Sequence, residues 1–413
     1  MQLTESLAWI FGLIIFLVIL VVSIGLHEAG HMVVAKAVKL HVPKFFVGFG
    51  PTIFSRKHKS TEYGVKAVPL GGFVLIEDDK TPKPDTSVYD DILAQSNIDD
   101  ETREKTEKER QKLLDDYEAR KKLLSHVSPW KRILVFMAGP VVNLILGAAI
   151  LITILMAFPS NFISNRIDTV NSCEQIKAGE SCGAERGGLQ PGDNIVSING
   201  TPVENSRQIS PLLANQNQVS VVVERNGSLQ QTFTVPVTNG KIGINLASVK
   251  RTATFGESVE AMKNLFVLNT ESLAKLPSKI PGLVNNILGT TERDAEAPSS
   301  IVAVGKTYGD TTASTRLTDG NKFKMMLMYS GLLNIGLGFI NLFLPLMPLD
   351  GGRIFMALLD SVKMGFSKLT RRVYRPIGPR GMGAMSIITG VPVLIFMSLI
   401  IISDLANIFR GVL

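Results

Sequence analysis

Four long apolar segments constrain this chain more than any other feature of its sequence. They cover residues 6–26, 133–158, 325–349 and 385–403, and none of them contains a charged residue. A helix of roughly 20 apolar residues is long enough to cross a bilayer. The first segment has no basic stretch before it and continues directly into HEAGH, so we expect a retained span rather than a cleaved signal peptide. The sequence therefore predicts a polytopic α-helical membrane protein with four transmembrane helices.

Charge predicts how these helices are oriented. The short segment between the third and fourth spans is rich in basic residues, namely Arg353, Lys363, Lys368, Arg371, Arg372, Arg375 and Arg380. Positively charged loops remain in the cytoplasm, so we expect both termini outside the plasma membrane, residues 27–132 inside and residues 159–324 outside. This loop is a sufficient cause of the net charge of +7. The expected partners therefore include membrane lipid and no nucleic acid.

These landmarks predict the domain organisation of the chain. In order, we expect a first transmembrane helix with HEAGH (1–43), a membrane-associated β-loop (44–76), a charged cytoplasmic insert (77–130), a second transmembrane helix (131–158), an extracytoplasmic PDZ-like β-rich domain (159–250), an amphipathic linker region (251–322), a third transmembrane helix with LDGG (323–352), a basic cytoplasmic loop (353–384) and a fourth transmembrane helix (385–413).

Two cytoplasmic segments differ sharply in composition. Residues 44–76 alternate short apolar runs with glycine and proline, which is typical of a β-hairpin. Residues 77–124 contain opposite charges at helical spacing, which predicts a solvated helix. A partner-docking or regulatory insert is the alternative for the second segment.

The stretch RGGLQPGDNIVSINGTPV predicts a compact β-rich unit within residues 183–245. It contains a turn at 191–193, a strand at Asn194–Ile198 and a hairpin turn at Asn199–Gly200, and alternating strands follow around residues 219–224 and 231–237. This stretch resembles the signature of PDZ domains. The resemblance implies a module that binds peptides by β-augmentation, and a steric gate without a ligand is the alternative.

Two further features of the predicted exterior are less specific. Residues 256–290 form an amphipathic stretch interrupted by Pro277 and Pro281, which would lie on the outer membrane surface or pack against the neighbouring module. Cys173 and Cys182 are the two cysteines of the chain. An oxidising exterior permits a disulfide between them, and two free thiols are the alternative.

The sequence HEAGH at residues 27–31 predicts a metal site. On a helix this spacing places the imidazoles of His27 and His31 one turn apart on one face, with Glu28 beside them. Neutral imidazoles suit Zn²⁺, and a glutamate can deprotonate a water that the metal has made acidic. Ionisable groups at the end of an uncharged membrane helix are costly, which favours a function over a bland polar cluster.

Asp350 is the predicted third ligand. It follows the third span in the sequence NLFLPLMPLDGG, and two histidines leave zinc one protein ligand short of a hydrolytic site. The first and third spans both run from outside to inside, so their ends meet the same face of the membrane. The predicted topology therefore brings Asp350 to the depth of His27 and His31.

Together these motifs resemble the site-2 protease family of intramembrane metalloproteases. HEAGH resembles the HExxH of that family, PLDGG its LDG motif, FVGFGP with TEYGVKAVPLGGFV its membrane-associated β-loop, and FMAGPVVNLILG its second core helix. The resemblance implies that His27, His31 and Asp350 bind zinc, that Glu28 is the general base and that Asn341 hydrogen-bonds an unwound substrate.

The same resemblance implies the class of substrate. Expected substrates are single-pass membrane proteins, with a bacterial anti-sigma factor as a typical example, cut second in regulated intramembrane proteolysis. A helical substrate hides its peptide bonds, so the site needs a device that unwinds it. The β-loop near Gly71 and Gly72 would supply a strand edge for this purpose. The alternatives are a membrane metal transporter or sensor that uses the same histidines and aspartate, and a scaffold that only binds peptides.

Overall fold

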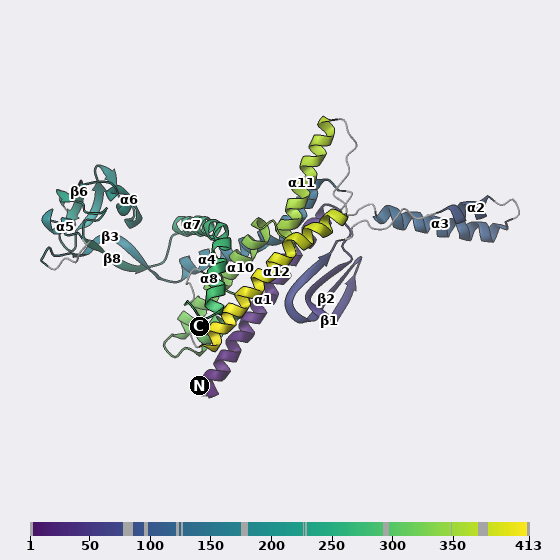
Figure 1. Ribbon diagram of the computed structural model, residues 1–413, viewed down its shortest axis with the longest axis horizontal. Coiled ribbons are helices and arrows are strands. Elements are labelled where there is room, and N and C mark those ends of the chain that lie inside the picture. Colours follow the sequence, from purple (N-terminus) through teal and green to yellow (C-terminus); the bar gives the residue numbers. More distant parts are fainter. Residues whose placement is uncertain are drawn as a thin grey trace. The chain divides into compact units, whose positions relative to one another are not determined.

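The computed structural model describes most of the chain in two compact units (Figure 1). One unit comprises Met1–Ile154 and Val259–Leu413, and the other comprises Leu155–Ser258. The described residues are 3–76, 86–94, 98–120, 124, 127–174, 181–225, 227, 229–291, 297–347, 349–370 and 379–410.

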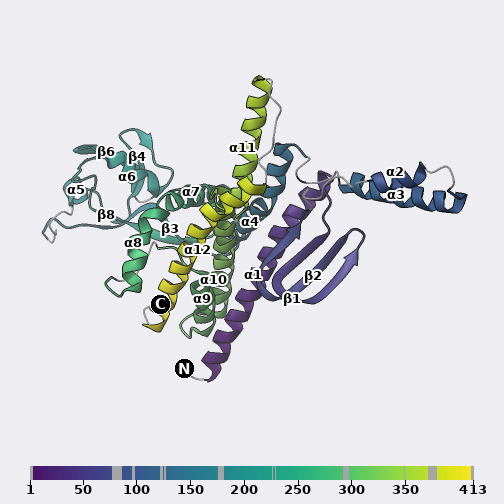
Figure 2. The same cartoon turned by 45° about the vertical axis from the view of Figure 1, so that its right-hand side comes forward.

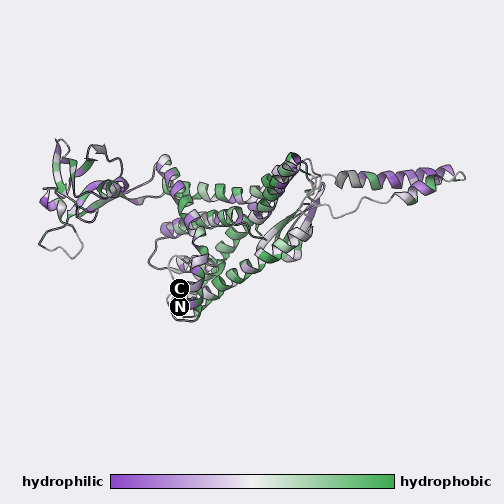
Figure 3. Cartoon of the chain, turned by 45° about the horizontal axis from the view of Figure 1, so that its top comes forward, coloured by the Kyte–Doolittle hydropathy of each residue, from purple (hydrophilic) through white to green (hydrophobic). Residues whose placement is uncertain are grey.

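The first unit is built on four long apolar helices. They are α1 (Leu3–Ala37), α4 (Pro129–Ala157), α10 (Asp319–Phe343) and α12 (Pro379–Phe409). Within the described residues, these four helices are long and apolar enough to cross a membrane. Figure 3 colours the long helices of this unit mostly as hydrophobic. Side chains such as Phe11 remain 61% exposed, because lipid would be their solvent. The prediction of four membrane helices is confirmed.

The prediction that residues 323–352 form one helix is wrong. Helix α10 ends at Phe343, and Leu344 is extended, with φ −81° and ψ 112°. Pro345 follows, and a proline excludes the preceding residue from the helical region. Asp350 therefore does not end the third span but begins a separate helix, α11 (Asp350–Leu369).

The prediction of a basic loop at residues 353–384 is wrong for its first half, which belongs to helix α11. Up to Leu369 this segment is helical, because its apolar residues recur at helical spacing between the basic ones. Ile354 and Ala357 on one side of the helix are buried against α4 residues Ile133 and Phe136. Residues 371–378 lie outside the described part of the chain.

The predicted β-loop is a two-stranded sheet of β1 (Lys44–His58) and β2 (Thr61–Leu75). Both strands bend, so that residues 44–47 have neighbours on both sides: Val47 pairs with Val65 and also with Gly72. Residues 72–75 consequently form one edge of the sheet. Figure 2 shows the hairpin beside the C-terminal half of α1, against which it packs.

The charged insert contains α2 (Ser87–Leu93) and α3 (Asp100–Arg120), which confirms its predicted helix. Arg110 joins the two helices through an ion pair of 2.7 Å with Asp90. Side chains at residues 100–115 of α3 are mostly exposed, as expected of a solvated helix. Residues 77–85 of the predicted insert lie outside the described residues.

The second unit is β-rich, as predicted. Its strands are β3 (Ser160–Val170), β4 (Asn194–Ile198), β5 (Thr201–Pro202), β6 (Gln218–Arg225), β7 (Leu229–Pro236) and β8 (Ile244–Arg251), with short helices α5 (Gly183–Arg186), η2 (Ser206–Gln208) and α6 (Ile209–Leu213). The antiparallel order is β7-β6-β4-β3-β8, with β5 on β4. Its core contains Ile195, Ile198, Val221 and Val223.

Several local predictions in this unit are confirmed. Strand β4 has the predicted bounds, and Asn199 and Gly200 both adopt positive φ, of 50° and 77°, which a tight hairpin turn requires. Cys173 and Cys182 form a disulfide. The resemblance to PDZ domains stays a prediction.

The predicted linker region at residues 251–322 is instead three helices, which corrects that interpretation. They are α7 (Phe255–Ala274), α8 (Leu276–Ile287) and α9 (Ile301–Ala313). Pro277 lies in the first turn of α8 and Pro281 inside it, so the only break between α7 and α8 is at Lys275.

These three helices pack against the membrane helices. Helix α9 lies against α1, where Gly12, Gly305 and Gly309 leave room for the neighbouring helix. Helix α8 packs on α12, where the buried Asn286 accepts hydrogen bonds from Ser403 and Asn407. These contacts were not predicted from the sequence, and the position of residues 256–290 at the outer membrane surface stays a prediction.

Candidate metal centre

His27 and His31 lie one turn apart on the same face of α1. Their ring centroids are 4.9 Å apart, and both residues are buried, with 9% and 6% exposed. The helix provides this arrangement by itself, because residues i and i+4 share a face. The predicted pair of imidazoles is therefore present inside the first unit.

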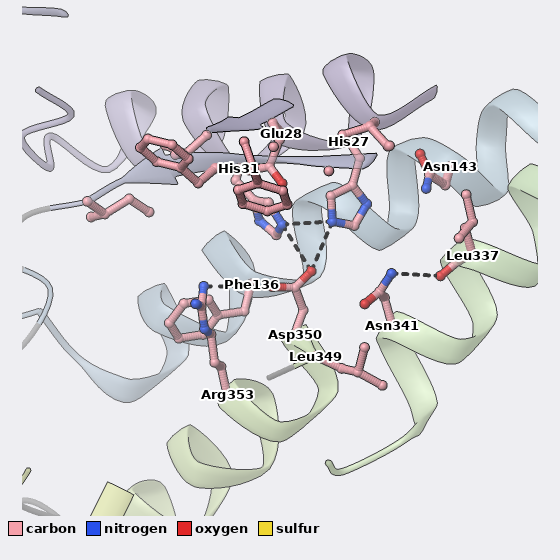
Figure 4. Close-up of a pocket in the computed structure, with 17 residues that line it drawn as sticks. His27, Glu28, His31, Phe136, Asn143, Leu337, Asn341, Leu349, Asp350 and Arg353 are labelled. Atoms are coloured by element: carbon pink, nitrogen blue, oxygen red, sulfur yellow. Dashed lines mark hydrogen bonds and ion pairs between the residues drawn. The ribbon is translucent and has the colours of Figure 1, made fainter. Parts of the chain in front are cut away.

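Asp350 completes the group from α11. Its Oδ2 lies 3.0 Å from Nε2 of His27 and 3.1 Å from Nε2 of His31, and the two Nε2 atoms are 3.2 Å apart (Figure 4). Asp350 is 8% exposed. It is the first residue of its helix, where the positive end of the helix dipole favours a carboxylate. Among the described residues, these three form the group that could hold a metal ion.

The hydrogen-bond partner of His31 indicates what the three atoms bind. Nδ1 of His31 lies 2.7 Å from the carbonyl oxygen of Val135, so it carries a proton and donates it there. In the neutral ring Nε2 then presents a lone pair, directed at the same point as the carboxylate oxygen of Asp350. Converging lone pairs repel one another unless a cation lies between them.

The dimensions of the triangle fit zinc. A tetrahedral zinc ion with bonds of about 2.0–2.1 Å holds its ligand atoms about 3.3 Å apart. The three edges here are 3.0, 3.1 and 3.2 Å. Two nitrogens and one carboxylate oxygen are also a donor set of catalytic zinc sites, which leave the fourth position open for water or substrate.

Glycines allow the helices to approach the two imidazoles. A Cβ on Gly139 of α4 would lie 2.3 Å from Nε2 of His31 and 2.8 Å from Nε2 of His27. A Cβ on Gly30 would lie 2.7 Å from the carbonyl oxygen of Ala138. Glycine is unfavourable within a helix, and here it is required because α1 and α4 cross at the metal centre.

The two glycines after Asp350 have a similar role. A Cβ on Gly351 would lie 2.1 Å from the carbonyl oxygen of Leu344, and one on Gly352 would lie 2.7 Å from the amide nitrogen of Met347. The chain leaving α10 therefore lies directly over the first turn of α11. This contact holds Asp350 at the distance at which it meets the histidines.

A cavity of about 480 Å³ adjoins the three ligands. All four other predicted site residues line it: Glu28, Asn341, Gly71 and Gly72. A Cβ on Gly72 would be 2.9 Å from Cγ of Glu28, so the edge of the β-sheet passes directly beside that glutamate. Asn341 donates a hydrogen bond from Nδ2 to the carbonyl of Leu337, at 3.0 Å.

Three residues of the site are not predicted from the sequence: Gly139, Asn143 and Arg353. Gly139 and Asn143 belong to FMAGPVVNLILG, from which the sequence predicts a core helix and no site residue. Arg353 was counted only as a loop charge, yet its guanidinium lies 4.0 Å from Oδ1 of Asp350 and over the ring of Phe136. An asparagine and a helix-breaking glycine inside an apolar span were the available signals.

Comparison with known proteins agrees with this geometry. The family model of peptidase family M50 matches residues 15–378. The zinc metalloprotease Rip1 of Mycobacterium tuberculosis (strain ATCC 25618 / H37Rv) is 28% identical over 97% of this chain and 98% of its own length. Rip1 of Mycolicibacterium smegmatis is 30% identical over 85% and 86% respectively. The chain therefore belongs to peptidase family M50, the site-2 protease family, and is a zinc metalloprotease of the membrane.

Proposed function

We propose that this enzyme hydrolyses peptide bonds in the transmembrane segments of single-pass membrane proteins. We further propose that it makes the second cut of regulated intramembrane proteolysis, with an anti-sigma factor as a typical substrate. One observation supports this function above the others. The His27–His31–Asp350 group is buried where α1 continues from an uncharged stretch, and it opens on a cavity lined by apolar residues such as Ile24 and Phe136.

The residues around the cavity suggest distinct roles in hydrolysis. We assign His27, His31 and Asp350 as the zinc ligands, and zinc bound there would supply Lewis acidity that activates water and polarises a carbonyl. Glu28 lines the same cavity, half-buried, and we assign it as the general base that takes the proton of the attacking water and passes it to the leaving amine.

The edge of the hairpin is the proposed binding site for the unwound substrate. Residues 72–75 pair with residues 44–47 on one side, and their other side is the sheet edge. An extended peptide can add to such an edge through main-chain hydrogen bonds. Gly71 and Gly72 keep this edge free of side chains beside Glu28, and the amide of Asn341 faces the same cavity. Together, the sheet edge and the Asn341 amide would hold the substrate in an extended conformation, in which a peptide bond is accessible to the attacking water.

The decisive experiment uses the purified full chain in detergent with a single-span reporter substrate. Glu28→Gln should abolish cleavage and keep about one zinc per chain, because the base is lost and the ligands remain. A strong chelator should abolish cleavage by the unmodified enzyme. Near-normal turnover by Glu28→Gln would refute the mechanism, and a metal transporter, which needs no base beside its metal, would then be favoured.

The orientation of the chain is also a proposal. Following the basic residues after α10, we propose that both termini and the unit Leu155–Ser258 lie outside the plasma membrane. Cysteines introduced at residue 230 should react with an impermeant reagent in intact cells, and those at residues 110 and 370 should not. Labelling at residue 370 would invert this orientation.

We propose that the unit Leu155–Ser258 is a gate that excludes substrates with bulky ectodomains. Val170 and Ile244 pair at the end of the β3–β8 ladder, so a short turn joining them can replace residues 171–243. This replacement should leave zinc binding intact and allow cleavage of an untrimmed substrate. If the unit recruits trimmed substrate instead, the replacement would raise its KM and leave the untrimmed substrate uncut.

A further inference from the structure

Beyond the three ligands, the metal centre contains a buried donor without an acceptor. Nε2 of His27 points at Asp350 and His31, so when this nitrogen binds the zinc the proton of the neutral ring is on Nδ1. This Nδ1 is buried, and no hydrogen-bond partner for it exists among the described residues. The equivalent atom of His31 donates to Val135. Metal-bound histidines almost always have such a partner, whether a carboxylate, a carbonyl or water.

Two acceptors without donors are found on the neighbouring helices. Oδ1 of Asn143 on α4 and Oδ1 of Asn334 on α10 are buried, and within the described part of the chain neither has a hydrogen-bond partner. The two residues are 2% and 1% exposed. Nδ2 of Asn334 is engaged, because it donates to Oγ of Ser23 at 3.0 Å and to the carbonyl of Ser330 at 2.9 Å.

Helix packing brings His27, Asn143 and Asn334 to the same level of the bundle. Ser23, the partner of Asn334, is one turn before His27 on α1, and Asn143 is one turn after Gly139, which contacts both histidines. Helices α4 and α10 touch on either side of the two asparagines. One contact is between Gly147 and Gly331, and the other is between the carbonyl of Pro140 and Gly338.

Asn143 and His27 line the same cavity, and Figure 4 draws both among its lining side chains. One unpaired donor and two unpaired acceptors are the complement of a single water molecule, which accepts one hydrogen bond and donates two. Buried waters typically make about three hydrogen bonds to otherwise unpaired groups.

We propose that a buried water binds between His27, Asn143 and Asn334 and makes Asn143 a positioning residue of the zinc site. The water accepts from Nδ1–H of His27 and donates to Oδ1 of each asparagine. It holds His27 in the tautomer whose Nε2 lone pair faces the metal, as the Val135 carbonyl does for His31. This inference rests on the zinc ligands and does not depend on which substrate is cleaved.

The test measures zinc affinity by competition with a chelator, using the purified full chain. Asn143→Leu removes the acceptor while keeping a branched side chain, and it should weaken zinc binding about 10–100-fold, the usual effect of losing a partner of a metal ligand. Asn143→Asp keeps an acceptor oxygen and should restore most of the affinity. Asn334→Leu should weaken binding in the same direction.

Asn286→Leu is the matched control. It makes the same change at an asparagine that is buried between α8 and α12 and bonded to Asn407, away from the ligands. It should reduce thermal stability and leave zinc affinity unchanged. Two results would overturn the proposal: Asn143→Leu binding zinc within two-fold of the unmodified protein, or Asn143→Asp binding as weakly as Asn143→Leu. An equal loss of affinity in Asn286→Leu would also overturn it, because it would indicate general destabilisation.

Discussion

Replacing Gly139 by alanine should disable the metal centre although no ligand residue is changed. The new Cβ would lie 2.3 Å from Nε2 of His31 and 2.8 Å from Nε2 of His27, whereas ordinary contact begins at 3.4 Å. Nε2 of His31 would have to retreat by about 1.1 Å and that of His27 by about 0.6 Å. Zinc sites tolerate deviations of only about 0.2 Å in ligand distance. Both histidines therefore lose their bonding geometry together.

The expected magnitude follows from these displacements. Zinc affinity should fall by more than the roughly 100-fold that loss of a supporting hydrogen bond can cause, because two ligands themselves are displaced. Overpacking between α1 and α4 should also lower the stability of the metal-free protein by about 1–3 kcal/mol. Proteolysis should disappear in parallel with the bound zinc.

The assay is zinc content per purified chain, together with chelator competition and thermal unfolding of the metal-free protein. Gly336→Ala in α10 is the control, because a Cβ there meets nothing within 4 Å. It should retain about one zinc per chain. If Gly139→Ala also retains one zinc at unchanged affinity, α4 does not restrain the histidines as the structure indicates.

Three further predictions concern other parts of the molecule. Asp350→Ala should lower zinc occupancy in metal analysis, and unchanged occupancy would exclude Asp350 as a ligand. Gly72→Val should lower kcat/KM on a reporter and keep zinc bound, because its Cβ meets Cγ of Glu28 at 2.9 Å; unchanged kinetics would argue against the sheet edge as the binding site. Burial raises the pKa of Asp193, but hydrogen bonds from Arg225 at 2.6 and 2.8 Å and from the Gln190 amide outweigh burial and hold this pKa below its ordinary value. The stabilisation that this lowered pKa gives is fully present above about pH 4 and is lost as the pH falls through the folded pKa. In a pH series of thermal unfolding, Arg225→Met should therefore cost about 1.5–3 kcal/mol at neutral pH, the usual value of hydrogen bonds to a charged group, and less in acid. An equal cost at all pH values would contradict this.

Local patterns in the sequence were enough for several elements. Strand Asn194–Ile198 and the turn at Asn199–Gly200 were predicted correctly, because alternation and positive-φ residues act within a few positions of the chain. The four apolar spans were also found, although their ends moved by several residues. The packing of α9 on α1 was not predicted, since it depends on glycines that meet residues about 300 positions away in the sequence.

By itself, the sequence determined the pair of histidines, because their spacing and the helix period are both local. It also determined which segments can enter a bilayer, since that depends on composition over about 20 residues. Only the tertiary structure decided how Asp350 reaches the two histidines. Helix α10 ends before Pro345, and Gly351 lets the chain that leaves α10 cross over the start of α11. Only the tertiary structure brings Asn143 into the same cavity as His27, because that depends on how closely α1 and α4 pack.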